Sequence, residues 1–210
     1  MDIITRKRNF QIFLVSSLVI SLASGIFGPF YIIFIQQKGG NIENFGIALG
    51  IMALTKSVAS LFTGKYSDIL GRKPLLISEG YASALLALSY IFIFKTWHLY
   101  ALQLINGILV GTNSTVGTSF LTDNIDQKNK GRDIGKYMAV IGVATSIAIM
   151  TSGYVVKMTS IKLIFVGMAI ASAFSASLLF FIKEKSPKKF IGLSYPIFSK
   201  NSKRTNKNYT

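Results

Sequence analysis

Three amide side chains recur on one face of a long apolar stretch. Gln103, Asn106 and Asn113 are spaced so that a helix places all three on the same side, together with Val110 and Gly117. An amide within an apolar helix needs a polar cavity or a partner helix for its hydrogen bonds. The donors and acceptors of these amides would suit a solute such as a sugar, an amide or another hydroxyl-rich molecule. Hydrogen bonding between helices is the alternative.

Two charged residues lie inside other apolar stretches. Lys56 precedes Asp68 by 12 residues, about 18 Å along a helix, which places it near the middle of a bilayer. A cation there costs about 2.5 to 3.5 kcal/mol and usually faces a cavity or a partner. We expect Lys56 to bind an anionic group or pair with an acid elsewhere, and snorkelling is the alternative. Glu79 lies nearer an end of its stretch, within reach of Lys73 or lipid headgroups, so no central carboxylate is expected.

A charged segment, GKYSDILGRK at 64–73, separates two apolar stretches. So short a segment predicts a tight turn, and Pro74 then begins the next helix because a first helical turn does not need its missing N–H. Asp68 and Arg72 lie four residues apart, which would bring them together if the segment is helical.

The composition indicates an integral membrane protein. Half of the 210 residues are hydrophobic, the mean hydropathy is +0.48, and the chain has no cysteine and one histidine. These counts argue against disulfides and against thiolate or histidine metal sites, so no metal cofactor is expected. No carboxylate cluster, histidine pair or nucleophile with a base is evident, so we expect no enzyme and no cofactor. The net charge of +15 comes from cations between and after the apolar stretches. We therefore expect contact with anionic lipids and no nucleic acid partner.

Six apolar stretches are each near the length that crosses a bilayer. The predicted fold is an all-α bundle of six transmembrane helices over 1–182, followed by a basic tail or linker at 183–210. The first stretch is too long for a signal peptide, so it is expected to be retained. The predicted spans are about 10–35, 42–62, 75–94, 99–121, 137–156 and 163–182.

The distribution of basic residues predicts the orientation. The N-terminus, the segments 64–73 and 122–136 and the tail together hold 18 of the 23 Lys and Arg residues. Basic residues are retained on the cytoplasmic side of cell membranes. Both termini and these segments are therefore expected to be cytoplasmic.

The pattern G-x-x-x-D-x-x-G-R-K between two spans resembles the loop signature of the major facilitator superfamily, which joins the second and third helices. The matching positions are Gly64, Asp68, Gly71, Arg72 and Lys73. The resemblance covers the chain to about residue 189 and implies the N-terminal six-helix half of a transporter that works by alternating access. It also implies that Asp68 and Arg72 form a cytoplasmic charge network that rearranges during transport.

Two other family signatures are incomplete. The fourth span keeps Gly107 and Gly111 but has Gln103 and Asn106 where the family has an arginine and a glutamine. In the fifth span, only Gly153 remains of the Gly-Pro-x-x-Gly-Gly motif of drug antiporters. The resemblance is therefore strong for the superfamily and poor for its drug/proton antiporters.

The function expected from this resemblance is secondary transport of a small solute, with or without a coupling ion. The solute cavity of the family lies between two six-helix halves, so we expect the chain to pair with a second copy or a separately encoded half. The resemblance also implies that the fourth helix lines this cavity, so we expect Gln103, Asn106 and Asn113 to contact the solute. The alternatives are a truncated fragment without transport activity and a membrane scaffold or sensor that retains the fold.

Overall fold

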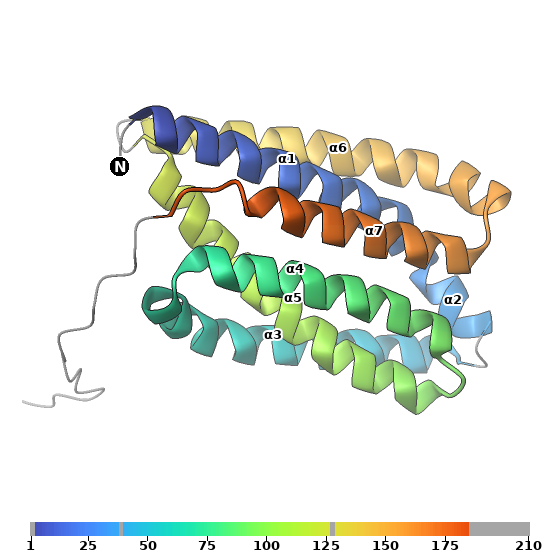
Figure 1. Ribbon diagram of the computed structural model, residues 1–210. Coiled ribbons are helices and arrows are strands. Elements are labelled where there is room, and N and C mark those ends of the chain that lie inside the picture. The colour runs from blue at the N-terminus through green and yellow to red at the C-terminus, as the bar shows by residue number, and fades with distance from the viewer. Residues whose placement is uncertain (1–2, 38–39, 127–128, 185–210) are drawn as a thin grey trace, which may run out of the picture.

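The computed structural model describes residues 3–37, 40–126 and 129–184, and nearly all of them are helical (Figure 1). No strand occurs in these three stretches, which confirms the all-α fold. The helical elements in chain order are α1 (Ile3–Phe27), η1 (Gly28–Phe30), α2 (Tyr31–Gln37), α3 (Ile42–Leu70), α4 (Arg72–Ser89), η2 (Tyr90–Phe92), α5 (Thr96–Asn124), α6 (Lys130–Met158) and α7 (Ile161–Leu179).

The six predicted spans lie largely within these helices. The first span consists of α1, η1 and α2 in succession, because Pro29 lacks an N–H and interrupts the regular helix with a 3-10 turn. Five of the six spans are long and apolar enough to cross a membrane. The exception is α5, whose 29 residues are long enough but whose amides, glycines and hydroxyl groups lower its hydropathy.

The charged connections are shorter than the sequence indicates. The predicted break over 64–73 is mostly helix, because α3 continues through Leu70 and α4 begins at Arg72. Gly71 alone makes the turn, with a φ of 92° that suits glycine. Within the predicted loop over 122–136, α5 likewise continues to Asn124 and α6 begins at Lys130. Hydropathy marks where an apolar segment ends, whereas the helical hydrogen bonds continue into the polar region.

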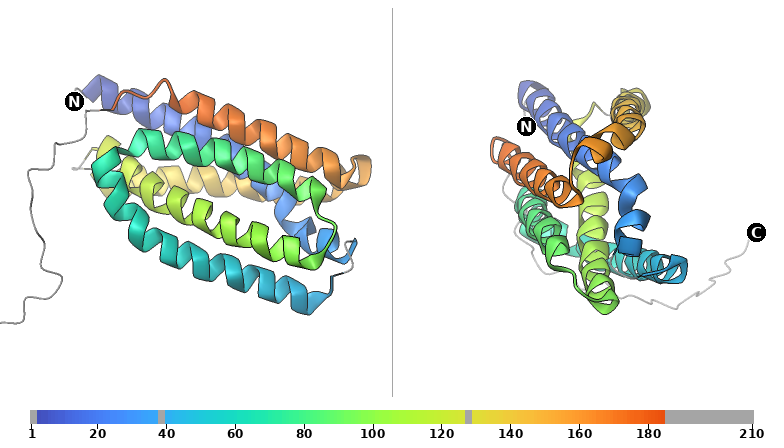
Figure 2. Two further views of the ribbon diagram at one scale, coloured as in Figure 1. Left: turned by 60° about the horizontal axis from the view of Figure 1, so that its bottom comes forward. Right: turned by 90° about the vertical axis from the view of Figure 1, so that its right-hand side faces the viewer.

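The helices pack in a consistent order of neighbours: α3, α5, α4, α7, α1 and α6. Exchanging the first three spans with the last three (α1 with α5, α3 with α6, α4 with α7) reverses this order and keeps the same neighbours. Two three-helix repeats related by a two-fold axis produce this arrangement. The end-on view in Figure 2 shows α1, α6 and α7 on one side and α3, α4 and α5 on the other.

Small residues allow α5 to lie close against α3. A Cβ atom added to Gly107 would be 1.8 Å from Thr55 Oγ1 and 2.5 Å from the Met52 carbonyl oxygen. A Cβ atom on Gly111 would be 2.6 Å from the Lys56 carbonyl oxygen. These glycines therefore bring the amides of α5 within reach of α3, as small residues commonly do between membrane helices.

The charged ends of the helices gather at one end of the bundle, which we call the basic end (Figure 1). It contains the starts of α1, α4 and α6 and the ends of α3, α5 and α7. That this end is cytoplasmic stays a prediction. Most of the predicted tail, residues 185–210, lies outside the described residues. The described cations of this end are Arg6, Lys7, Arg8, Lys65, Arg72, Lys73, Lys130, Arg132, Lys136 and Lys183.

Candidate functional site

A cavity of about 680 Å³ is lined by side chains from α1, α3, α4, α5, α6 and α7. This volume lies within the range of sites for small molecules. The lining is largely apolar, with serines from α1 and α7 and a small group of amide and acid side chains from α4 and α5.

The three amides predicted from the sequence all line this cavity. Gln103 Nε2 donates a hydrogen bond to the Tyr31 hydroxyl. Asn106 Nδ2 donates to Gln103 Oε1 at 3.1 Å and contacts Met52 Sδ at 3.4 Å. Much of the hydrogen-bonding capacity of Gln103 and Asn106 is therefore used within the protein, as the interhelical alternative required. Their role in solute contact stays a prediction.

Lys56 is not among the residues that line the cavity. Its side chain is exposed on α3, although its backbone carbonyl lies against Gly111 of α5. The structure therefore does not bring Lys56 into the site formed by the amides. Its predicted pairing with an anionic group or with an acid of another unit stays a prediction.

The cavity also contains a carboxylate that the sequence did not indicate as functional. Glu79 of α4 lines the cavity and is 9 % exposed. Its Oε1 accepts a hydrogen bond from Ser83 Oγ at 2.7 Å, and its Oε2 accepts one from Asn113 Nδ2 at 2.7 Å. The expected contact with Lys73 is wrong, because the Lys73 ammonium group bonds to carbonyl oxygens of the α7 end. The third amide of α5 is thus a partner of a buried acid.

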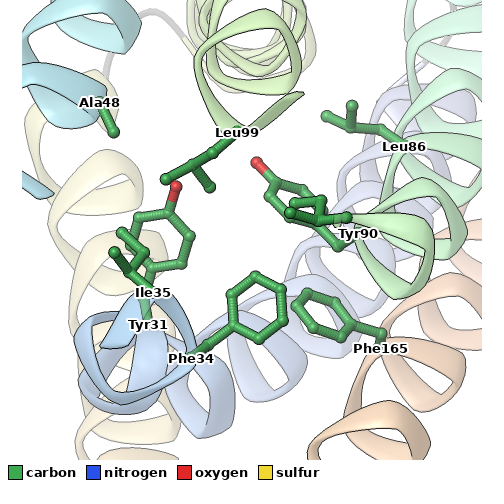
Figure 3. Close-up of a cluster of buried hydrophobic side chains, with 9 residues drawn as sticks. Tyr31, Phe34, Ile35, Ala48, Leu86, Tyr90, Leu99 and Phe165 are labelled. Atoms are coloured by element: carbon green, nitrogen blue, oxygen red, sulfur yellow. The ribbon is translucent and has the colours of Figure 1, made fainter. Parts of the chain in front are cut away.

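Aromatic rings close the end of the cavity that is remote from the basic end. Tyr90 and Phe165 stack with centroids 5.2 Å apart, and Phe34 meets Phe165 edge to face at 4.9 Å. Figure 3 shows the hydroxyl groups of Tyr31 and Tyr90 on the side away from the rings of Phe34 and Phe165. This end of the cavity therefore combines an apolar floor with two hydroxyl groups.

Arg72 connects the loop signature to α5 at the basic end. Its Nη2 lies 3.8 Å from Asp68 Oδ1, so the pair predicted from the four-residue spacing is present in the structure. Its Nη1 donates to the Ser119 carbonyl oxygen and to Asp123 Oδ2. The second acid, Asp123, was not predicted as a partner. Whether these charges act in transport stays a prediction.

The end of α7 is fastened to the start of α4 in the same region. The Glu184 carboxylate accepts hydrogen bonds from the backbone N–H groups of Arg72 and Lys73 at 2.7 and 3.0 Å. The Lys73 ammonium group donates to the carbonyl oxygens of Phe180 and Ile182, each at 2.8 Å. An acid at a helix N-terminus satisfies backbone donors and interacts favourably with the helix dipole. Gly71 and Lys73 of the signature are thus placed beside Glu184.

Comparison with known proteins decides the family. The model of the major facilitator superfamily matches residues 13–203. The chain belongs to the major facilitator superfamily. It is therefore a multi-pass membrane protein of a transporter family, whose members are not enzymes, and the resemblance carried by the loop signature is confirmed.

Relatives differ in how much of their length the chain spans. The uncharacterized MFS-type transporter YitZ of Bacillus subtilis is 26% identical over 161 residues, which are 76% of this chain and 93% of that protein. Multidrug resistance protein MdtG of Citrobacter koseri is 27% identical over 122 residues, or 56% of this chain and 30% of MdtG. The class H tetracycline resistance protein of Pasteurella multocida is 30% identical over 139 residues, or 66% and 34% of the two chains.

The chain thus spans about a third of the length of these two drug-resistance proteins. The sequence pattern argued against drug antiporters, because only Gly153 remains of their fifth-span motif. Similarity to proteins with drug-resistance names persists without that motif, so its absence does not separate the chain from them.

Proposed function

We propose that this chain is one six-helix half of a secondary transporter, and that its cavity binds a small solute during alternating access. The observation that carries the proposal is the cavity of about 680 Å³, in which polar groups from α4 and α5 converge within a major facilitator fold. The Arg72 network at the basic end supplies contacts that would form and break as two halves rock against each other.

The exposed faces of α3 and α6 support pairing with a second six-helix unit. These helices lie at the two ends of the neighbour order. Only 6% and 11% of their apolar windows are buried within the chain, compared with 33% for α4 and α7. A second copy or a separate half would cover them and close the cavity. The concentration of cations at one end would hold two copies parallel, with that end on the cytoplasmic side and near anionic lipids.

Flux into vesicles tests the proposal. Purified protein is reconstituted, and uptake of labelled glucose, glutamate and tetraphenylphosphonium is measured against protein-free vesicles. We expect uptake of at least one probe and its loss in Asp68→Asn, which removes the negative charge that faces Arg72. Asp133→Asn is the matched control, because it changes an acid of α6 outside the ion pairs of Arg72. Absence of flux for all three probes from folded, inserted protein would favour a scaffold or sensor.

A further inference from the structure

We propose that the cavity takes an organic cation with an apolar body, and that Glu79 binds its positive charge. This inference rests on the proposed function, because it names the class of solute that the cavity would bind. It replaces the expectation of a hydroxyl-rich solute, which was based on the three amides alone.

The charges of the residues that line the cavity favour a cation. Among the described residues that line it, Glu79 is the only carboxylate, and none is Lys, Arg or His. A charged group inside a membrane protein is normally matched by a partner charge. Within the part of the chain that the structure describes, Glu79 receives two neutral donors, the hydroxyl of Ser83 and the amide of Asn113. A bound cation would neutralise the carboxylate in place of a proton, whereas an anion would be repelled.

The carboxylate of Glu79 retains free capacity to accept hydrogen bonds. A carboxylate has about four acceptor positions, and Glu79 uses two of them in the structure. By contrast, Gln103 and Asn106 are bonded to each other, to Tyr31 and to Met52. The strongest unsatisfied attraction in the cavity is therefore electrostatic and is located at Glu79.

Aromatic rings line the same cavity as the acid. Phe13 and Tyr137 are stacked at 6.0 Å between centroids, and both line the cavity. A Cβ atom added to Gly117 would lie 3.3 Å from Phe13 Cζ and 3.8 Å from Asn113 Oδ1, so this ring and the amide that bonds Glu79 both approach Gly117. Ring faces attract organic cations. The acid and the rings thus favour the same kind of ligand.

The length of the cavity provides space for an apolar body. Glu79 and Tyr90 both line it and are separated by 11 residues of α4 and η2, about 16 Å along the helix. Between them, the wall consists largely of apolar and small side chains, and it ends at the rings of Tyr31, Tyr90 and Phe165. A cationic group bound at Glu79 can therefore extend an apolar portion toward these rings.

The test measures binding to purified protein in detergent, where no flux is needed. The probes are tetraphenylphosphonium, the neutral triphenylphosphine oxide and the anionic tetraphenylborate, which compare charge on similar apolar groups. We expect the cation to bind most tightly. Glu79→Gln should weaken its binding by about 10- to 100-fold, the range for a hydrogen-bonded charge, and should change binding of the neutral probe little.

Glu43→Gln is the matched control, since this acid in the first turn of α3 does not line the cavity. Equal affinity for the cation and the anion in the unaltered protein, or an unchanged cation affinity in Glu79→Gln, would overturn the cation site. The unaltered protein alone decides the charge preference, so the test does not depend on how well the variant folds. Vesicles without flux would contradict the proposed function and leave a charge-selective binding site standing.

Discussion

Glu79 and Glu184 each accept two hydrogen bonds, yet their surroundings differ. Glu184 is exposed at the basic end, where its carboxylate receives the first backbone N–H groups of α4 and lies beside Lys73. Glu79 is buried in the cavity and receives only the neutral donors Ser83 and Asn113. The first carboxylate lies at a helix N-terminus, whereas the second receives neutral side-chain donors inside the bundle.

Equal numbers of hydrogen bonds therefore do not make the two acids equivalent. A carboxylate at a helix N-terminus is stabilised in place by the backbone and by water. A carboxylate inside the span loses its hydration and has no cation in return. Removing the charge of Glu184 should therefore destabilise the basic end, whereas removing the charge of Glu79 should leave the cavity intact. Variants at Arg72, Glu184 and Glu79 test this difference.

Arg72→Ala should have the largest effect on stability. It removes the hydrogen bonds to the Ser119 carbonyl and to Asp123 as well as the pair with Asp68. We expect the free energy of unfolding to fall by about 2 kcal/mol, because a charged hydrogen bond contributes about 1.5 to 3 kcal/mol and exposed acids contribute less. Thermal unfolding in detergent measures this loss.

Lys65→Ala is the matched control for that variant. It removes a cation of the same loop signature, and its exposed side chain belongs to neither ion pair of Arg72. Its stability should stay within about 0.5 kcal/mol of the unaltered protein. An equal loss in both variants would show that the total positive charge matters and that the Arg72 contacts do not.

Glu184→Ala should have an intermediate effect. The variant leaves the N–H groups of Arg72 and Lys73 without their carboxylate acceptor, and loss of such a cap costs about 1 kcal/mol. Glu184→Gln should lose less, because its amide oxygen still accepts one hydrogen bond. Affinity for tetraphenylphosphonium should not change in either variant. A loss of affinity comparable to that of Glu79→Gln would remove the distinction between the two acids.

The sequence predicted features that depend on local pattern. The apolar stretches predicted the helices of the six spans. The three- and seven-residue spacing placed Gln103, Asn106 and Asn113 on one cavity-lining face, and the four-residue spacing brought Asp68 and Arg72 together. Each of these follows from the period of a single helix. These features could be predicted because they do not depend on where any other helix lies.

Contacts between distant helices were not predictable in this way. The bonds of Arg72 to Asp123 and of Asn113 to Glu79 join residues 51 and 34 positions apart, and they depend on the rotation of α4 against α5. Lys56 shows the same limit. Counting residues gives its position along α3, but it does not give the direction in which its side chain points. The signal available for Glu79 was its place within an apolar stretch, but the direction of its side chain into the cavity depends on the neighbouring helices.

Glu79→Gln should have the smallest effect on stability. Unlike Glu184→Ala, it should not lower the free energy of unfolding. The new amide oxygen can accept from Asn113, and the amide nitrogen can donate to Ser83, whose hydroxyl group rotates to accept. Both contacts survive while the buried charge disappears. We expect the free energy of unfolding without ligand to stay unchanged or to rise by up to about 1 kcal/mol.

Glu79→Leu provides the contrast, because it removes the charge and leaves Asn113 and Ser83 without their acceptor. Its stability should be lower than that of Glu79→Gln by about 1 to 3 kcal/mol, the cost of unsatisfied buried donors. A loss in Glu79→Gln as large as that in Glu79→Leu would mean that the negative charge itself holds α4 to α5. Glu79 would then be a structural acid like Glu184. Retained stability together with lost cation affinity would leave ligand binding as the function of the charge.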